Sequence, residues 1–232
     1  MGRAFLCYNG PTMSQEGAAH MREEEKIFAG KMFYPFDEEL CAIKLRTHNL
    51  NLDYNATYHH ETEKREQILK EIFLSIGEES TVMGPMYLHY GKHTTVGDRF
   101  FANFNLVIQD DAKVTIGDDC NFGPNVTIVT PKHPLLPDER RLLMDTDGKA
   151  KHMCYALPVT IGNDCWLAAG VTVCGGVTIG NNCVIGAGSV VTRDIPDNSF
   201  AAGVPCRVIR TITEADSMKY HPEIMGDKRV IE

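Results

Sequence analysis

The sequence predicts a mainly β protein in which a coil of short stacked strands follows a cap of helices. Three observations support this prediction. An aliphatic residue recurs at every sixth position from Ile161 to Val191, and the residue after each of them is small in nearly every case. A less regular form of the same period runs upstream to Val96. Helix-type spacing of apolar residues is confined to the segment between Arg22 and Gly77.

Composition and charge limit what this fold can do. The chain has 232 residues, 43% of them hydrophobic, which is enough for one domain with a sizeable core. Its formal net charge is -8 and no segment is strongly basic, so no nucleic-acid partner is expected. The most apolar stretch, Trp166 to Val177, is too short to cross a bilayer, so no membrane partner is expected. The eight cysteines form no C-x-x-C pair and the N-terminus lacks a signal-peptide core, which predicts a cytoplasmic protein without a disulfide scaffold or zinc ribbon.

The N-terminal part divides into a tail and a helical cap. Residues 1–20 show no periodicity and are predicted to form a flexible tail. Residues 21–80 form the predicted cap, whose first helix starts near Arg22 and ends at Gly30, a favourable C-terminal cap. Asp37 is placed to cap the second helix and Thr62 the third. The apolar stripe of the third helix, which runs up to Gly77, consists of Ile68, Leu69, Ile72, Phe73 and Ile76.

Residues 81–210 are predicted to form the coiled β domain, followed by a C-terminal tail over residues 211–232. Six residues make one short strand and a bend, so three such units close a triangular coil of eighteen residues. Each residue then stacks on the one eighteen positions later, as Ile161 on Ile179, at the strand spacing of about 4.8 Å. Cys165 and Cys183 are expected to stack in the interior as small core residues. The period breaks between residues 130 and 158, an excursion of a length typical of functional or disordered loops.

Several motifs together resemble the galactoside and maltose O-acetyltransferases, and most closely the galactoside enzymes. The matching segments are AGKMF at 29–33, KREQILKEIF at 64–73, FANFNLVIQDD at 101–111, KHP at 132–134, PVTIGNDCW at 158–166 and VIGAGSVVTRDIPDNSFAAGVPCRVIR at 184–210. This family belongs to the hexapeptide-repeat acyltransferases, so the resemblance implies a left-handed parallel β-helix. The general preference for right-handed parallel crossovers would predict the opposite hand. The resemblance also implies acetyl-CoA as co-substrate and a homotrimer with active sites between subunits.

The catalytic candidates lie in two of these motifs. From the residues alone, His133 is either a solvated loop histidine or a general base, and its match to the family's catalytic histidine in KHP favours the base. Asn103 in FANF is either a structural corner residue or, as the resemblance implies, a donor that binds the acceptor and stabilises the oxyanion. Asp111 is either a solvated acid beside Asp110 or, as the resemblance implies, a carboxylate that contacts the acceptor.

A second set of residues matches the family's contacts to coenzyme A. Small residues at the pantetheine positions are equally expected from a coil corner, so the sequence alone leaves both interpretations open. The single tryptophan occupies an outward position of its repeat, where a large aromatic favours a ligand or a subunit contact. Four further residues beyond the last aliphatic position match contacts to the nucleotide end. The full set is Trp166, Ala169, Ala187, Thr192, Arg193, Arg207 and Arg210.

The acceptor pocket departs from the family pattern. Pro35 stands where the galactoside enzymes carry an aspartate, Lys44 replaces an arginine and His89 replaces a serine. Lys44 and His89 are therefore expected to contact an acceptor, but galactoside should not be assumed to be that acceptor. The excursion after His133 is also longer than in that group, and Cys154 replaces a methionine. Whether this excursion acts as a lid is left open.

The leading hypothesis is an acetyl-CoA-dependent O-acetyltransferase that acts on a sugar or glycoside by direct transfer in a ternary complex, without a metal. One alternative is an assembly scaffold of the same fold without activity, which acetyl-CoA binding would discriminate. A second alternative is a zinc-dependent carbonic anhydrase, which would require three converging histidines. The candidates near the coils are His89, His93 and His133, and metal analysis would discriminate this class.

Overall fold

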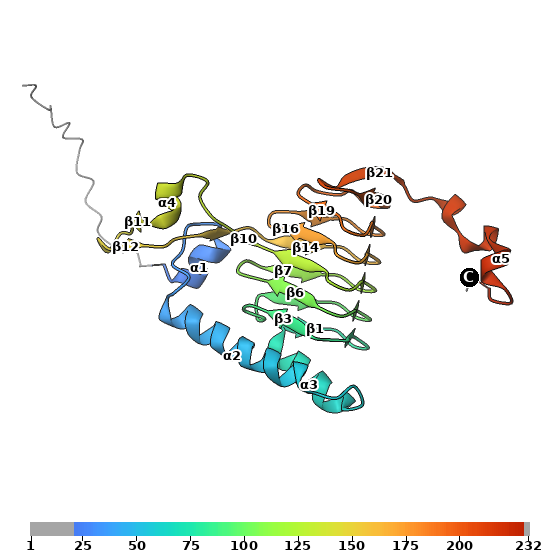
Figure 1. The fold of residues 1–232 in the computed structure, drawn as a ribbon, viewed down its shortest axis with the longest axis horizontal. Helices are drawn as coiled ribbons and strands as arrows, with labels where there is room; N and C mark the ends of the chain where they lie inside the picture. The colour runs from blue at the N-terminus through green and yellow to red at the C-terminus, as the bar shows by residue number, and fades with distance from the viewer. Residues whose placement is uncertain (1–20, 230–232) are drawn as a thin grey trace, which may run out of the picture.

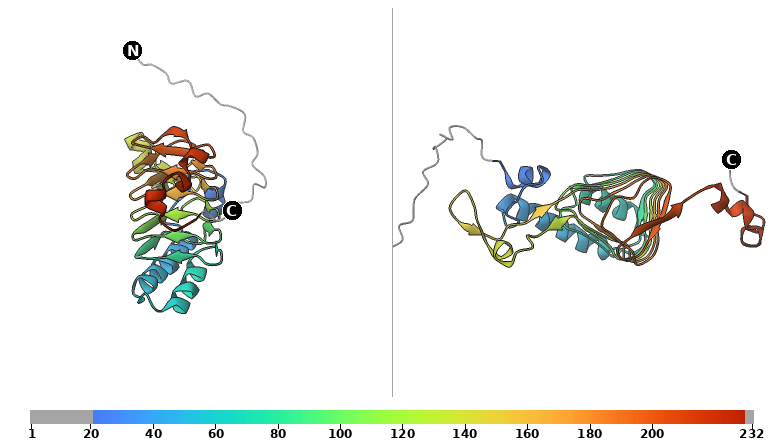
Figure 2. Two further views of the ribbon diagram at one scale, coloured as in Figure 1. Left: turned by 90° about the vertical axis from the view of Figure 1, so that its right-hand side faces the viewer. Right: turned by 90° about the horizontal axis from the view of Figure 1, so that it is seen from above.

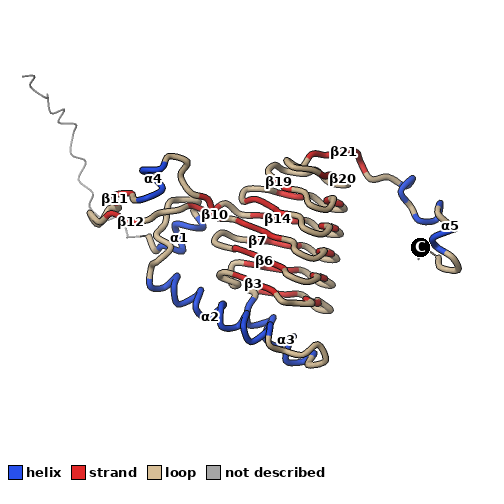
Figure 3. The backbone as a smooth tube through the Cα atoms, viewed as in Figure 1, coloured by secondary structure: helices blue, strands red, loops and turns tan. Residues whose placement is uncertain are grey.

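The computed structural model describes residues 21–229, in which a stack of short strands rises from two long helices (Figure 1). The predicted flexible tail at residues 1–20 lies outside the described residues. Helix α1 spans Glu23–Phe28, α2 spans Glu38–Asn55 and α3 spans Thr62–Ile72. The strands are only two to five residues long and alternate with turns along every coil (Figure 3).

The cap follows from local signals that the sequence contains. Gly30 ends α1 with a φ of 66°, and the backbone N–H of Lys31 donates to the carbonyl of Lys26 at 2.9 Å. Asp37 caps α2 as predicted, because its carboxylate accepts from the N–H groups of Glu39 and Leu40. The prediction for Thr62 was wrong: Thr62 is the first helical residue of α3 and Glu61 precedes it without a side-chain cap.

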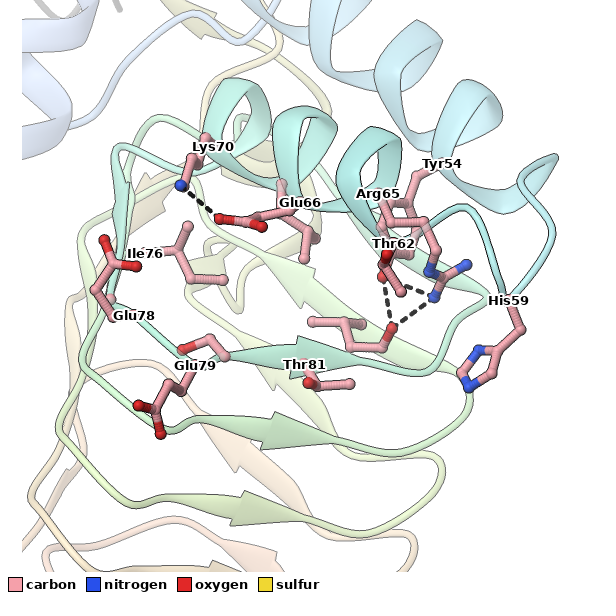
Figure 4. A pocket seen from close by; sticks show the side chains of 14 residues that line it. Tyr54, His59, Thr62, Arg65, Glu66, Lys70, Ile76, Glu78, Glu79 and Thr81 are labelled. Carbon is pink, nitrogen blue, oxygen red and sulfur yellow. Dashed lines mark hydrogen bonds and ion pairs between the residues drawn. The ribbon is translucent and has the colours of Figure 1, made fainter.

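The third helix seals the open lower edge of the strand stack. Arg65 donates to the carbonyl oxygens of Val82 at 2.7 Å and Met83 at 2.9 Å, and to the hydroxyl of Tyr54 at 2.8 Å. These contacts satisfy strand carbonyls that have no neighbouring strand to pair with. Figure 4 shows Arg65 and Tyr54 meeting above this edge, within a hollow of about 460 Å³.

Three parallel sheets form the sides of the β-helix, and the coils superpose when seen along its axis (Figure 2, right). Sheet I consists of β1 (Ser75–Ile76), β4 (Thr94–Val96), β7 (Val114–Ile116), β14 (Val159–Ile161) and β17 (Thr178–Ile179). Sheet II consists of β2 (Thr81–Val82), β5 (Phe101–Ala102), β8 (Asn121–Phe122), β15 (Trp166–Leu167), β18 (Val184–Ile185), β20 (Ser199–Ala202) and the antiparallel β21 (Arg207–Thr211). Sheet III consists of β3 (Met86–Leu88), β6 (Leu106–Gln109), β9 (Thr127–Val129), β16 (Thr172–Cys174) and β19 (Val190–Val191). We name the edges between sheets by the two sheets they join.

The register confirms the predicted stacking. Ile161 pairs with Ile179, eighteen residues later, and equivalent steps join Leu167 to Ile185 and Val173 to Val191. Upstream the step is twenty residues, as in the pairs of β4 with β7, because each of these coils has two additional residues. The six aliphatic side chains just named are at most 1% exposed, so they form the core. Cys165 and Cys183 are buried in the interior of the coils, as expected.

The predicted start of the coils at residue 81 was too late. Strand β1 already pairs with β4, so the first coil begins at Ser75 and the helix pattern ends at Ile72. The sequence holds a signal for this start. Ile76-Gly77-Glu78 has the same form as Val96-Gly97-Asp98 one coil later, and Ile76 pairs with Val96.

A ladder of side chains closes the I–II edge. At each coil, a carboxylate or amide oxygen accepts a hydrogen bond from the backbone N–H of its counterpart in the coil before it, at 2.7 to 2.9 Å. The ladder consists of Asp98, Asp118, Asn163, Asn181 and Asp197. The residue before each of the first four ladder positions is a glycine that has no room for a Cβ atom. A Cβ atom at Gly180, for example, would collide with Oδ1 of Asp197.

The excursion at residues 130–158 is an ordered arm that projects from the β-helix (Figure 2). Its base is an antiparallel ribbon of β10 (Pro131–Lys132) and β13 (Tyr155–Ala156). Its outer part contains α4 (Pro137–Arg141) and the hairpin of β11 (Leu143–Met144) and β12 (Ala150–Lys151). Beyond β21, two 3-10 turns (Glu214–Asp216 and Met218–Tyr220) and α5 (Pro222–Met225) extend away from the coils (Figure 1).

Candidate active site

Two consecutive buried aspartates mark the III–I edge. Asp110 and Asp111 directly follow β6, and they are 0% and 3% exposed. The Asp110 carboxylate accepts hydrogen bonds from the backbone N–H of Tyr90 at 2.7 Å and from the Thr94 hydroxyl at 2.8 Å. Oδ2 of Asp111 and the hydroxyl of Tyr90, by contrast, are buried without a hydrogen-bond partner in residues 21–229. Asp111 is therefore not the solvated acid that the sequence left open, and one of its carboxylate oxygens has hydrogen-bonding capacity that residues 21–229 do not use.

The surroundings of Asp111 move the pKa of its carboxyl group toward neutral pH. Burial, reinforced by the charge of Asp110, raises the pKa of Asp111 to about 6, while the Lys44 ammonium acts in the opposite direction. Burial and the nearby Asp111 also raise the pKa of Tyr90 well above its usual range, so the hydroxyl keeps its proton. The Lys44 ammonium lies 5.7 Å from the centroids of the Phe36 and Tyr90 rings. The predicted acceptor residue Lys44 therefore lies close to Tyr90 and Asp111.

His93 holds the turn that carries both aspartates. Its Nδ1 atom lies 2.9 Å from the carbonyl oxygens of Asp110 and Asp111, and its Nε2 atom lies 3.2 Å from the Glu24 carboxylate. Because carbonyl oxygens can only accept, Nδ1 is the ring nitrogen placed to donate to this turn. The ring also stacks on Tyr90 with centroids 4.6 Å apart. No sequence pattern links Glu24 to His93 across 69 residues, so sequence reasoning did not find this pair.

His89 lies beside the Tyr90 ring, with centroids 5.1 Å apart, and contacts a histidine that the sequence reasoning missed. Its Nδ1 atom lies 3.1 Å from Nε2 of His48 on α2. Burial, with the charges of Lys44 and His48, lowers the pKa of His89 to about 4, so its ring is neutral at physiological pH. The four-residue spacing of Lys44 and His48 places both on one face of α2, which is the signal that would have identified His48.

The three histidines of the zinc alternative do not converge. His89 contacts His48, His93 contacts Glu24 and two carbonyl groups, and His133 lies on the arm. In the part of the chain that the structure describes, no group of three or more histidine, cysteine, aspartate or glutamate side chains is arranged to hold a metal ion. The donor arrangement does not fit a carbonic anhydrase site.

His133 directly follows β10 at the base of the arm and is exposed. Pro131 pairs with Ala156 and Lys132 with Tyr155, so the next position sets His133 opposite Cys154. Directly opposed residues of an antiparallel ribbon project from the same face. Cys154 is buried in one cluster with Tyr90, Phe33 and Ala112, which anchors the base of the arm against the cap and the III–I edge.

Two further contacts define the base of the arm. The backbones of Phe33 and Cys154 exchange hydrogen bonds of 2.8 and 3.2 Å, which fixes the arm to the cap. Burial, with Asp111 nearby, raises the pKa of the Cys154 thiol to about 12, so it is protonated at neutral pH and a poor nucleophile. His152 faces His133 with ring centroids 5.4 Å apart. Sequence reasoning missed His152. Its position two residues before Cys154 makes it a diagonal cross-strand neighbour of His133.

The other candidate residues lie at or near the II–III edge, which is at the opposite end of the sheet III strands from Asp111. Asn103 ends β5 at the II–III edge, where its side-chain oxygen accepts the N–H of Phe104 at 2.8 Å. Ala169 and Ala187 stack on this edge in later coils, joined by a hydrogen bond of 2.8 Å from the N–H of Gly188 to the Ala169 carbonyl. Trp166, on β15, is 54% exposed and lies on the outer face of sheet II. These four residues share one side of the β-helix.

The residues expected to bind the nucleotide end of coenzyme A lie on different sides of the last coil. Thr192 and Arg193 follow β19 at the III–I edge and are exposed. Arg207 and Arg210 lie on β21, opposite Ala202 and Phe200 of sheet II. The Arg210 guanidinium forms two hydrogen bonds of 2.6 and 2.7 Å with the carboxylate of Asp216. One chain therefore does not gather all four into a single cluster.

Within one chain, the catalytic candidates are also apart. Strand β6 separates Asn103 from Asp111, and its four residues correspond to about 13 Å of extended chain. Asp111, Lys44 and His89 lie near the III–I edge and His133 lies on the arm beside His152, whereas Asn103 and the two alanines lie at the II–III edge.

Comparison with known proteins agrees with this architecture. Residues 26–77 match the maltose acetyltransferase hexapeptide capping motif, and residues 158–193 match the bacterial transferase hexapeptide. Residues 113–131 match the hexapeptide repeat of succinyl-transferase. The fold and these matches define a hexapeptide-repeat acetyltransferase.

Comparisons over most of the chain identify its family more specifically. It is 45% identical to galactoside O-acetyltransferase of Escherichia coli K12 over 211 residues, covering 91% of this chain and all of that protein. A structure of galactoside acetyltransferase in complex with coenzyme A superposes with a TM-score of 0.80 at 43% identity, covering 92% of this chain and all of that one. A maltose O-acetyltransferase from Clostridium difficile 630 gives a TM-score of 0.76 at 41% identity, covering 84% of this chain and 99% of that one. The chain belongs to the galactoside and maltose O-acetyltransferase family.

These findings confirm the predicted fold class, a left-handed parallel β-helix with an N-terminal helical cap. They also confirm the predicted class of enzyme, an acetyl-CoA-dependent O-acetyltransferase, and its co-substrate. None of the helices in residues 21–229 is long and apolar enough to traverse a membrane.

Proposed function

We propose that this enzyme transfers the acetyl group of acetyl-CoA to a hydroxyl of a sugar or glycoside, with His133 as general base. The observation that carries the proposal is the buried Asp111 carboxylate, which lies near Cys154 at the base of the arm that carries His133. The relatives named as galactoside and maltose O-acetyltransferases support a sugar as acceptor.

Asp111 and its neighbours are proposed to hold the acceptor. A carboxylate with a free oxygen accepts a hydrogen bond from a sugar hydroxyl, and the protonated Tyr90 hydroxyl beside it can donate one. Lys44 supplies a positive charge at the same pocket, and the neutral His89 ring supplies a further polar contact. The alternation of donors and acceptors suits a polyhydroxylated ring.

The chemical step is proposed to be direct. The acceptor hydroxyl attacks the thioester carbonyl of acetyl-CoA while an imidazole nitrogen of His133 takes the hydroxyl proton. The carbon–sulfur bond then breaks, and the imidazolium returns the proton to the leaving thiolate. An acyl-enzyme on Cys154 is disfavoured because that thiol is buried and its pKa is raised to about 12.

Asn103 is proposed to stabilise the oxyanion of the tetrahedral intermediate. Its side-chain oxygen is already bonded to the N–H of Phe104, so the amide NH₂ is the group that it can offer to a ligand. A fixed donor of this kind gains most when negative charge develops on the carbonyl oxygen. The coenzyme is proposed to lie along the same edge, against Trp166, Ala169 and Ala187.

The separation of the two catalytic candidates supports a homotrimer with its sites between chains. His133 of one chain and Asn103 of the next would together complete a site that neither chain holds alone. The arm also exposes apolar side chains that a neighbour would cover, among them Leu135 at 92% exposure. Each site would then contain Thr192 and Arg193 of one chain and the II–III edge of the other, along which the pantetheine arm of the coenzyme is proposed to lie. A cytoplasmic location stays a prediction.

One experiment tests the base and the shared site together. His133→Ala should lower kcat by about 10² to 10⁴, the usual share of a positioned general base, and leave acetyl-CoA binding intact. Asn103→Ala should also lower kcat but keep the pH profile of the wild type. Product should be followed by mass spectrometry because eight cysteines interfere with thiol reagents.

The two inactive variants should restore activity when unfolded and refolded together. In random mixed trimers about one site in four would combine an intact His133 with an intact Asn103 from different chains. If each site lay within one chain, every site would carry one lesion and no activity would return. A His133 variant with wild-type turnover would refute the assigned base, and absence of acetyl-CoA binding by calorimetry would favour the inactive scaffold.

A further inference from the structure

The backbone turn that carries Asp111 is held by two other segments of the chain. The carbonyl oxygens of Asp110 and Asp111 both lie 2.9 Å from Nδ1 of His93, so one ring N–H is shared by two successive peptide groups. The backbone N–H of Ala112 donates at 2.9 Å to the hydroxyl oxygen of Thr130. The chain therefore curls around the imidazole ring at the residue proposed to hold the acceptor.

The direction of the Asp111 carboxylate depends on this turn. The neighbouring carboxylate of Asp110 is fixed by the backbone N–H of Tyr90 and the hydroxyl of Thr94. Oδ2 of Asp111, by contrast, has no partner in residues 21–229. Hydrogen bonds weaken steeply when they are misaligned, so a small rotation of the turn would weaken a bond from Asp111 to a ligand.

The helical cap holds His93 in turn. Nε2 of the ring lies 3.2 Å from the carboxylate of Glu24 on α1, and the Lys92 ammonium lies 3.2 Å from the same oxygen. Burial opposes the ionisation of Glu24, but hydrogen bonds from His93 and Lys92 outweigh it and lower the pKa of Glu24. Glu24 is therefore a charged anchor that sets Nε2 toward α1 and Nδ1 toward the turn.

Packing fixes the plane of the imidazole ring. Tyr90 stacks on it with centroids 4.6 Å apart, and Phe28 of α1 meets it edge-on at 4.9 Å. His93 is 2% exposed and Glu24 is 9% exposed, so little of either is available to a bound sugar. An effect of this pair on the acceptor is therefore expected to pass through the turn.

We propose that Glu24 and His93 are positioning residues for the acceptor: Glu24 orients the imidazole, and the imidazole holds the turn that directs the Asp111 carboxylate. The inference rests on the proposed function, in which Asp111 accepts a hydrogen bond from the acceptor. It assigns helix α1 of the cap a part in acceptor binding.

Two substitutions at His93 separate the contacts of its two nitrogens, because the amide nitrogen of asparagine takes the place of Nδ1 and that of glutamine the place of Nε2. The probes are methyl β-D-galactopyranoside, methyl β-D-glucopyranoside and maltose, each with saturating acetyl-CoA. His93→Gln should raise the acceptor KM about tenfold and leave kcat and the acetyl-CoA KM within about twofold of wild type. His93→Asn keeps a donor toward the turn and should hold the acceptor KM within about threefold of wild type.

Substitutions on α1 test the anchor. Glu24→Leu removes the polar contact and should raise the acceptor KM about threefold to tenfold, whereas Glu24→Gln keeps a polar group at the same distance and should stay near wild type. Glu25→Leu is the matched control, because Glu25 lies on the same helix, is exposed and bonds to Arg22. This control should keep the wild-type kinetic constants.

A double variant tests whether the effect passes through Asp111. In an Asp111→Asn background, adding His93→Gln should lower the acceptor kcat/KM by no more than about twofold further, because residues of one network are not additive. A further loss of about tenfold would show that His93 acts independently of Asp111 and would overturn the inference.

The outcomes separate this inference from the proposed function. Wild-type acceptor KM in both His93→Gln and Glu24→Leu, with Asp111→Asn impaired, would overturn the positioning pair and leave the proposed function intact. Equal rises in His93→Gln and His93→Asn would also overturn it, since the donor toward the turn would not matter. If His93→Gln fails to fold by circular dichroism, the two Glu24 variants decide. An unimpaired Asp111→Asn variant, or no transfer to any of the three sugars, would overturn the proposed acceptor site and the positioning pair with it.

Discussion

Replacing Asp111 with asparagine should stabilise the folded enzyme at neutral pH while it impairs acetyl transfer. Burial raises the pKa of this carboxyl from 3.8 to about 6, so the folded protein binds its proton more tightly than the unfolded chain does. At about 1.4 kcal/mol for each pKa unit, this difference corresponds to ~3 kcal/mol of lost stability once the group is ionised. Asparagine keeps the shape of the side chain and removes the charge.

The sign of the effect depends on pH in a defined way. Below about pH 3 the carboxyl is protonated in both states, and the two proteins should be equally stable. Between about pH 3 and 6 the unfolded chain loses the proton first, so the wild type loses stability relative to Asp111→Asn. Above about pH 6 both states are ionised and the advantage of the variant should stay constant at its maximum.

The assay is urea unfolding of both proteins at a fixed protomer concentration and a series of pH values, since assembly makes stability concentration-dependent. The same variant should lower kcat/KM for the acceptor by about tenfold to a hundredfold, as expected for a lost hydrogen bond to a charged group. The KM for acetyl-CoA should be unchanged. An equal stability difference at pH 4 and pH 7, or a variant that is less stable at pH 7, would refute the reasoning.

Three further predictions address the coils and the coenzyme. Ile179→Ala should cost about 2 to 5 kcal/mol of stability, because the fully buried side chain leaves a cavity; a loss within about 0.5 kcal/mol would contradict the assigned core position. Gly180→Ala should cost about 1 to 3 kcal/mol, because its Cβ would collide with Asp197; unchanged urea unfolding would show that the ladder can yield there. The double variant Arg207→Ala and Arg210→Ala should raise the acetyl-CoA KM with little change in acceptor KM, because phosphate contacts by arginine are charge-assisted. Unaltered acetyl-CoA affinity by calorimetry would move the nucleotide site elsewhere.

The repeating part of the fold could be predicted because its information is local. A period of six places aliphatic side chains on one side of every short strand, and closing the coil after three strands fixes which residues stack. The pairing of Ile161 with Ile179 follows directly from that count. Caps such as Asp37 are equally local, since the side chain bonds to N–H groups two and three residues away.

The sequence predicted the identity of the catalytic candidates but not their arrangement. Resemblance in short motifs identified His133, Asn103 and Asp111, but their arrangement depends on the lengths of the turns between strands. Only the structure shows that Asn103 and Asp111 occupy opposite ends of β6. A spacing of eight residues in sequence does not reveal on which edge of the coil each side chain lies.

The sequence by itself determined the coil, its helical cap and the family to which the chain belongs. The tertiary structure alone decided the chemistry of the pocket: that Asp111 is buried with a free oxygen, that Glu24 reaches His93 across 69 residues, and that His48 meets His89. The physical reason is that a repeat is set by neighbours along the chain and by identical neighbouring coils. Burial and pKa depend instead on which distant segments pack over a residue, and no local pattern encodes that packing.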